Sequence, residues 1–92
     1  WVAVHPNDSS AWGALGQLWG RLNQPLRSLR AEAESRAALG DLLGAVDRLR
    51  AGQKAAQSGG AVDFIDLSVI DARLRDIEAQ RKAIAADEKA TK

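Results

Sequence analysis

Few side chains of this sequence are of the types that carry catalysis, and those present stand apart from one another. His5 is the only imidazole in 92 residues, and it precedes Pro6 in a predicted turn. A catalytic or zinc-binding histidine needs partners that converge on it, so we predict that His5 lies in a surface loop. The serines have no neighbouring base in the sequence to activate a hydroxyl, and nucleophilic catalysis therefore has no support.

The aspartates towards the C-terminus raise the question of a metal site. They lack the glycine turn and the final glutamate of a calcium-binding loop. Helix capping, and pairing one turn apart as between Asp71 and Arg75, explains them better. Cysteine is absent, which excludes disulfides and thiolate zinc sites. We predict no catalytic, cofactor-binding or metal-binding residue, and no enzyme activity, in this chain. The aspartates concerned are Asp63, Asp66, Asp71 and Asp76.

The arginines suggest a binding chemistry instead, because a guanidinium group holds a carboxylate through two parallel hydrogen bonds. Arg27 and Arg30 would lie on the concave side of a helical stack, and Arg48 and Arg50 are further candidates for holding a carboxylate. The alternative is a solvated face on which arginines pair with aspartate and glutamate, as such charged faces commonly do. The candidate partner-binding residues are Gln17, Arg21, Arg27, Arg30 and Glu34.

The overall composition limits the kinds of partner. Lys and Arg number 13 and Asp and Glu 12, and this formal charge of +1 excludes the basic surface of a general nucleic-acid binder. No apolar run approaches the ~20 residues that cross a bilayer, and Trp1–Val4 is too short and uncharged for a signal peptide. Because methionine is absent, we expect a parent protein that continues upstream, with residues 1–5 as the stub of a preceding helix.

Four helices are predicted to position these side chains. The first spans about Ser9–Leu22, follows a capping Asp8 or Ser9, and carries an apolar stripe at helical spacing. Each glycine in a helix interior costs about 1 kcal/mol relative to alanine. The three glycines here therefore predict the close approach of a neighbouring helix. They are Gly13, Gly16 and Gly20.

The second helix is predicted over about Pro25–Leu39, because proline suits the first helical position. Gly40 and Asp41 indicate a stop and a new N-cap. The third helix then covers about Leu42–Gln57.

A glycine and serine connection at residues 58–61 leads to a C-terminal packing helix over 62–84. The residues after Ile84 have nothing to bury, so the tail 85–92 is expected to fray or be disordered. The predicted core comprises Trp12, Leu15, Trp19, Leu22, Leu29, Leu49, Phe64, Ile70, Leu74 and Ile77.

The spacing of large and small residues matches a helical repeat. The pattern W-x2-L-G-x2-aromatic that begins at Trp12 is typical of the first helix of a tetratricopeptide repeat, and Ala45-x3-Leu49 is similar to its second-helix pattern. The two matches stand half a repeat out of register. We therefore predict that the second helix pairs with both of its neighbours in an antiparallel helix-turn-helix stack over residues 6–57, an all-α solenoid fragment.

Several segments over roughly residues 5–78 follow the pattern of one known family, most specifically in the block Ala31–Ala45 and the run Ile70–Leu74. They resemble the C-terminal tetratricopeptide region of periplasmic zinc metallopeptidases of the beta-barrel assembly-enhancing protease family. Arg36 departs from the family pattern, since it stands where an aromatic residue is common. In that family an upstream domain holds zinc in an HExxH motif, which this chain lacks, so no catalytic residue is carried over and zinc is expected only upstream.

The resemblance implies a periplasmic location and a helical region that docks onto outer-membrane assembly machinery and presents client proteins. From the residues and this likeness we predict a non-catalytic protein–protein interaction module that acts in outer-membrane protein assembly and quality control. One alternative is a structural domain that packs on its own protease domain and gates it. Another is self-association through Trp1–Val4 or the stripe Phe64–Ile77, although a monomer with other proteins as partners is the main expectation.

Overall fold

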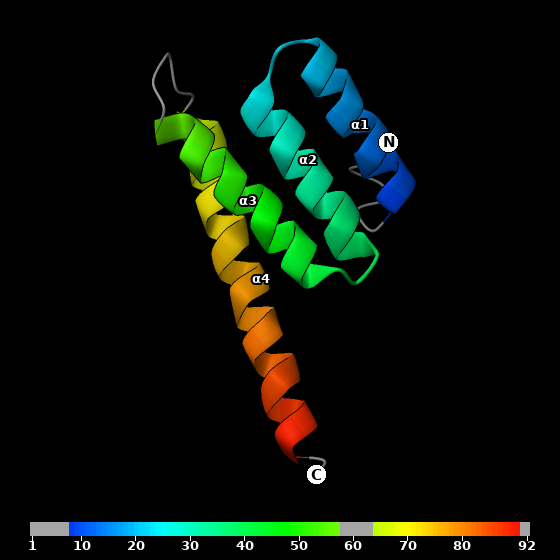
Figure 1. The fold of residues 1–92 in the computed structure, drawn as a ribbon, viewed down its shortest axis with the longest axis vertical. Coiled ribbons are helices and arrows are strands. Elements are labelled where there is room, and N and C mark those ends of the chain that lie inside the picture. The colour runs from blue at the N-terminus through cyan, green and yellow to red at the C-terminus, as the bar shows by residue number, and fades with distance from the viewer. Residues whose placement is uncertain (1–7, 58–63, 91–92) are drawn as a thin grey trace.

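The computed structural model describes residues 8–57 and 64–90, and these form four helices (Figure 1). The helices are α1 (Ser9–Arg21), α2 (Pro25–Ala38), α3 (Leu42–Gln57) and α4 (Phe64–Ala90). Each runs antiparallel to the one before it, and the two ranges contain no strand. This confirms the predicted all-α stack, whose arrangement is consistent with a tetratricopeptide-like fold. None of the described helices is both long enough and apolar enough to cross a membrane.

Helix α1 begins with a capping residue and packs closely on α2. Asp8 caps α1, because its Oδ1 accepts a hydrogen bond of 2.9 Å from the Ala11 amide. Gly16 is buried against α2, where Ser28 Oγ donates to its carbonyl oxygen at 2.8 Å. A Cβ at Gly16 would lie 3.4 Å from the Ser28 carbonyl oxygen, in van der Waals contact, so α1 and α2 approach closely here as the sequence predicted.

The turn between α2 and α3 follows the predicted stop and restart. Gly40 has a φ of 84°, in the left-handed region that glycine adopts without strain. Asp41 then caps α3, since its Oδ1 accepts a hydrogen bond of 2.9 Å from the Gly44 amide.

The hydrophobic core lies between α2, α3 and α4. Ile70 and Ile77 of α4 are fully buried against α3, and Gly52 makes room for Ile70, whose Cδ1 would lie 2.9 Å from an added Cβ. No residue of α1 belongs to this cluster of buried residues. Its members are Ala33, Ala45, Val46, Leu49, Ile70 and Ile77, with Leu26, Ala37, Leu42 and Leu74 packed around them.

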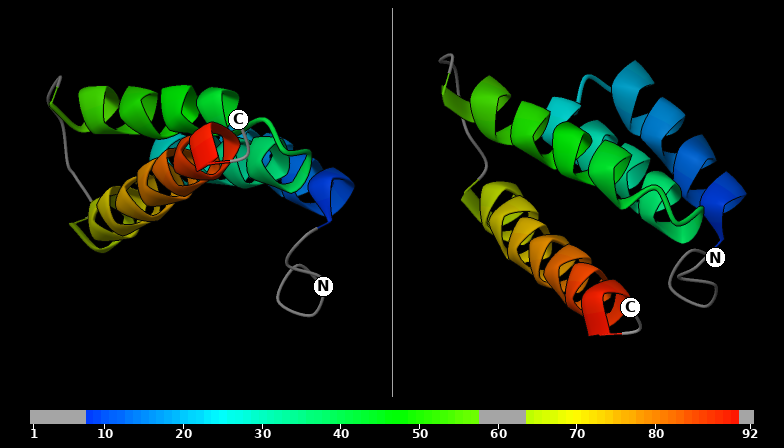
Figure 2. Two further views of the ribbon diagram at one scale, coloured as in Figure 1. Left: turned by 90° about the horizontal axis from the view of Figure 1, so that it is seen from below. Right: turned by 60° about the horizontal axis from the view of Figure 1, so that its bottom comes forward.

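Helix α2 is the centre of the arrangement. Its backbone approaches α1 and α3 along their lengths and α4 over a shorter stretch, whereas α1 approaches α2 alone among the four helices. Figure 2 shows α1 and α4 on either side of the α2–α3 pair. The prediction that the second helix pairs with both neighbours is thus confirmed.

Two predicted core residues are exposed. Leu22 is 55% exposed, because α1 ends at Arg21 and Leu22 is its C-cap. Phe64 is 76% exposed. It lies six residues before Ile70, which turns it about 120° around the helix from the buried side at 3.6 residues per turn. Trp12, Leu49, Ile70 and Ile77 are buried as predicted, and the half-buried members of the set are Leu15, Trp19, Leu29 and Leu74.

The end of the chain differs from the expected frayed tail. Helix α4 starts at Phe64 and continues to Ala90, well beyond the other helices (Figure 1). Residues 83–89 are exposed, so little of this segment is buried against the other helices. Their alanine, glutamate and lysine content favours the helix through intrinsic propensity instead. The predicted stub at 1–5, the loop at His5 and the connection at 58–61 lie outside the described residues.

Candidate partner-binding groove

A recess of about 260 Å³ lies over α2 between α1 and α4, and we call it the α2 groove. It exists because α1 and α4 both pack against α2 while their backbones stay apart, which leaves α2 as the floor. The lining residues are Trp12, Leu15 and Trp19 from α1, Arg27, Arg30 and Ala31 from α2, and Asp66 and Val69 from α4.

Two pairs of an indole and a guanidinium group form the groove. Arg27 Cζ lies 5.0 Å from the ring centroid of Trp19, and Arg30 Cζ lies 5.3 Å from that of Trp12. Both distances suit cation–π attraction, which contributes about 0.5–2 kcal/mol depending on exposure. Trp12 is only 8% exposed, so the predicted core role of this indole is confirmed, and Trp19 is half-buried. The guanidinium groups therefore lie over the indole rings within the groove.

Arg27 is also bound to α4. Its Nε donates hydrogen bonds to both carboxylate oxygens of Asp66, at 3.0 and 3.3 Å. This ion pair crosses the groove from α2 to α4. It leaves the charge of Arg27 balanced within the chain.

Glu34 is the most deeply buried charged residue of the predicted partner-binding set. It is 7% exposed, and its two carboxylate oxygens accept hydrogen bonds of 2.7 and 3.0 Å from Arg73 Nε on α4. A buried carboxylate requires such a partner, because burial of an unpaired charge is very costly. The hydrogen bond to Glu34 raises the pKa of Arg73 above its usual value, although partial burial opposes this. Glu34 therefore joins α2 to α4 and is not available to a partner.

Arg30 is less closely paired with a carboxylate than Arg27 and Arg73 are. Its Nη2 lies 3.9 Å from the Glu34 carboxylate that Arg73 already holds. Its Nε is buried and has no hydrogen-bond partner among residues 8–57 and 64–90. One carboxylate is thus shared between two arginines, and Arg30 has the longer contact.

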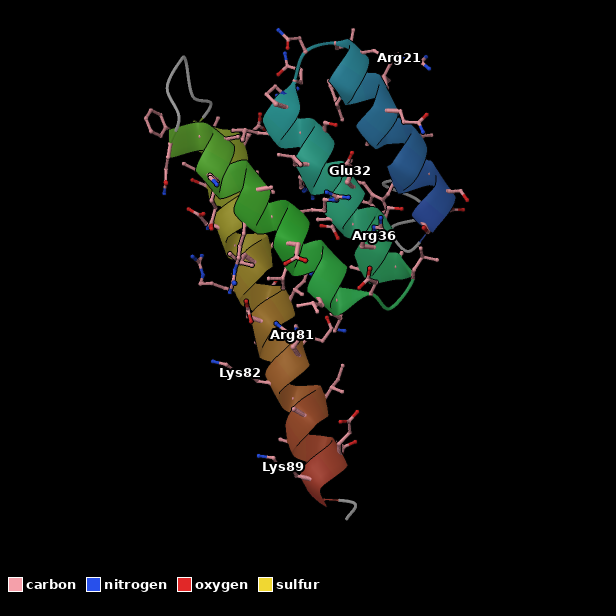
Figure 3. All side chains as sticks on the ribbon, viewed as in Figure 1. Arg21, Glu32, Arg36, Arg81, Lys82 and Lys89 are labelled. Atoms are coloured by element: carbon pink, nitrogen blue, oxygen red, sulfur yellow. The ribbon has the colours of Figure 1, made fainter. Side chains whose placement is uncertain are left out.

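Gln17 and Arg21 do not join the other candidate residues. Both are exposed, and neither lines the α2 groove. They lie five and nine residues after Trp12, which turns them about 140° and 180° around α1 from that indole. Figure 3 shows Arg21 at the outer edge of the molecule. The structure therefore brings Arg27, Arg30 and Glu34 together at α2 and leaves Gln17 and Arg21 on another surface.

Outside the groove, the arginines follow the alternative of a solvated, paired face. Arg48 lies 3.5 Å from Glu32 of α2, and Arg50 Nη2 donates to Glu78 of α4 at 2.8 Å. Asp71 is also used between helices, because it accepts a hydrogen bond of 2.7 Å from Gln53. These contacts hold α3 to its neighbours. Among Arg27, Arg30, Arg48 and Arg50, pairing with an acidic residue of the same chain accounts least well for Arg30.

Asp66, Val69 and Arg73 were not predicted as part of a site. The sequence nevertheless contained a signal. Arg27 and Glu34 are seven residues apart, and so are Asp66 and Arg73, with the order of positive and negative charge reversed. Positions seven apart share one face of a helix. The two helices run parallel (Figure 1), so the two pairs match in order.

A second apolar surface lies at the other end of the molecule. A recess of about 390 Å³ separates the α2–α3 turn from the late part of α4, and its walls include Leu43 and Ile84. The stripe predicted for self-association is different, and it is mostly unavailable, because Ile70 and Ile77 are in the core. Trp1–Val4 lies outside the described ranges.

Neither metal chemistry nor similarity to known proteins adds to this geometry. The part of the chain that the structure describes holds no group of three or more His, Cys, Asp or Glu side chains suited to a metal ion. No family model matches the sequence, and no curated protein or solved structure matches it either.

Proposed function

We propose that this chain is a non-catalytic protein–protein interaction module that receives a segment of a partner protein in the α2 groove. The observation that carries the proposal is the pair of indoles and arginines that lines the groove. Tryptophan and arginine are enriched among the residues that dominate binding energy at protein interfaces. The volume of about 260 Å³ lies below the roughly 300–1,000 Å³ of common small-molecule sites. It suits one or two side chains of a larger partner.

We further propose that the module is the C-terminal region of a periplasmic zinc metallopeptidase that acts in outer-membrane protein assembly and quality control. The support is the resemblance over residues 5–78, and zinc would lie only in the upstream domain. Sequencing the gene upstream of Trp1 tests this part, because an HExxH motif is expected there. A parent protein without that motif would contradict the metallopeptidase assignment and would leave the groove proposal unaffected.

The groove proposal is tested by selecting segments that bind the purified chain from a display library of random 12-residue segments. Selected segments are then measured against two variants. Val69→Lys places a long charged side chain in the groove wall, where Val69 is 37% exposed. Leu43→Lys makes the same kind of change at the distant apolar surface, where Leu43 is 57% exposed.

We expect Val69→Lys to abolish binding and Leu43→Lys to leave it unchanged. Equal binding by both variants would contradict the proposal. The isolated protease domain of the parent protein, added in place of the segments, tests the gating alternative. Groove-dependent binding of that domain would show that the module packs on its own protease.

A further inference from the structure

We infer that the α2 groove selects segments in which a side-chain carboxylate lies beside an apolar side chain, and that Arg30 binds the carboxylate. This inference rests on the proposed function and names the chemistry of the occupant. It assigns different roles to Arg27 and Arg30, which look equivalent in the sequence. It also separates the polar part of the groove from its apolar wall.

Arg27 is held in place by residues of its own chain. Both oxygens of Asp66 accept from its Nε, and its guanidinium group lies over Trp19. An incoming carboxylate would have to displace Asp66 and leave that aspartate without its counter-charge. The exchange would replace one ion pair with another and give little net gain.

Arg30 is one turn further along α2, and its charge is only partly balanced. Glu34 lies 3.9 Å away and is held at 2.7 Å by Arg73. At 3.9 Å from the Glu34 carboxylate, Nη2 is too far away for a hydrogen bond to it. The Nε is buried and unpaired among the described residues, so the Nη groups are the donors that an incoming carboxylate would meet. The side chain is 39% exposed, so a partner can reach the outer part of the fork. A carboxylate is the planar acceptor that matches this fork.

The lining of the groove complements a negative charge as a whole. Arg27 and Arg30 are cations and Asp66 is an anion, so the charged lining residues sum to 2 − 1 = +1. Arg30 lies over Trp12, and the rest of the lining is mostly apolar, with Leu15 and Trp19 from α1 and Val69 from α4. A segment that carries an acidic and an apolar side chain close together satisfies both parts.

The occupant is an internal stretch of chain. From Trp12 to Trp19 the lining follows two turns of α1, about 10 Å at 1.5 Å per residue. Two side chains of one segment can occupy that length. A terminal carboxylate alone would use only one part of it.

The experiment uses the same 12-residue library with both ends of each segment fused to a carrier, so that no free C-terminus is offered. Segments selected on the wild-type chain should be enriched in Asp or Glu adjacent to Leu, Ile, Val or Phe. Segments selected on Arg30→Gln should keep the apolar preference and lose the acidic one. The stem of Arg30 is retained in this variant, and circular dichroism and urea denaturation verify that it folds.

Two control variants separate Arg30 from a general effect of charge. Arg48→Gln and Arg50→Gln each remove an exposed arginine that lies outside the groove. Both should retain the acidic preference. Loss of that preference in either control to the same extent as in Arg30→Gln would overturn the role of Arg30.

A selected segment is then synthesised with an amidated C-terminus, with and without replacement of its acidic residue by Gln or Asn. The replacement should raise the Kd on the wild-type chain about tenfold, as for a hydrogen bond to a charged group, and less than about threefold on Arg30→Gln. Groove-dependent segments without acidic enrichment would overturn this inference and leave the proposed function standing. Groove-dependent segments that are selected only from a library with free C-termini would overturn it as well. Failure to select any groove-dependent segment, with fused or with free ends, would overturn both.

Discussion

Glu34 of α2 and Arg73 of α4 form a charge-assisted contact in which one guanidinium nitrogen donates to both carboxylate oxygens, at 2.7 and 3.0 Å. Together with Arg27 and Asp66, this contact specifies the register of the two helices. If α4 slid by seven residues, Arg73 would lie beside Arg27 and like charges would meet. The core alone does not exclude such a shift, because apolar side chains tolerate exchange more readily than buried charges do.

Removing the charge of Glu34 tests the importance of this contact. Glu34→Gln should lower the free energy of unfolding by about 1.5–3 kcal/mol, because Arg73 loses a charged hydrogen-bond acceptor in a largely buried position. Urea denaturation followed by circular dichroism measures the change. Asp76→Asn is the control, since Asp76 lies 4.0 Å from Arg73 and its side chain is 74% exposed. The control should change stability by less than about 1 kcal/mol, and an equal loss in both variants would contradict the prediction.

The close contact between Gly52 and Ile70 leads to a double-mutant prediction. In Gly52→Ala the new Cβ would lie 2.9 Å from Ile70 Cδ1, so the core must shift at a cost of about 1–3 kcal/mol. Alanine gains about 1 kcal/mol in helix propensity. We therefore expect a net loss of up to about 2 kcal/mol, measured by urea denaturation.

The loss should disappear when Ile70→Val removes the Cδ1 methyl group that causes it. Gly13→Ala serves as the matched helix-interior control, because its nearest neighbour would be Ser35 Oγ at 3.6 Å, and it should stabilise the protein. Strict additivity of Gly52→Ala and Ile70→Val would mean that the two positions are not coupled through this contact.

The two groove indoles should differ in their contribution to stability. Trp12 is buried and Trp19 is half-buried, so Trp12→Ala is expected to cost about 3–5 kcal/mol and Trp19→Ala distinctly less. Thermal unfolding of both variants measures the order. A greater loss in Trp19→Ala would place the main contact of α1 at the other end of the groove.

The exposed end of α4 should be dispensable for stability. Deletion of residues 86–92 removes side chains that, as far as the structure describes them, are exposed, and the free energy of unfolding should change by less than about 0.5 kcal/mol. The mean residue ellipticity at 222 nm should fall. Deletion of residues 77–92 is the contrast, because it removes the fully buried Ile77 and should prevent cooperative folding. A large loss in the short deletion would reveal a packing role for the tail.

The helices and most of the core could be predicted from the sequence because their signals are local. Capping by Asp8, the left-handed Gly40 and the period of Ile70, Leu74 and Ile77 each depend on neighbours along the chain. Phe64 was misplaced because repeated steps of three residues drift around the helix by about 60° each. The tail was misjudged because propensity sustains an exposed helix where packing does not.

The groove was less predictable because its charges are assigned across helices. Whether an arginine faces solvent, a carboxylate of its own chain or a partner depends on residues far away in the sequence. Arg27 and Arg30 look equivalent in the sequence. The position of α4 distinguishes them, because Asp66 of α4 pairs with Arg27, whereas Arg73 of α4 takes the Glu34 carboxylate that Arg30 would otherwise hold. Gln17 and Arg21 were grouped with them through repeat spacing, although they lie on another side of α1.

The attachment of α1 to α2 alone, outside the main core, gives the two walls of the groove unequal rigidity. The α4 wall is anchored by buried isoleucines, whereas the indole wall can open without disturbing them. Amide hydrogens of α1 should therefore exchange with deuterium before those of α3, since local opening requires only the loss of one interface. A bound segment would slow that exchange by tying α1 to the rest of the molecule. Affinity in such a module then depends on the flexibility of one helix as well as on the contacts that the segment makes.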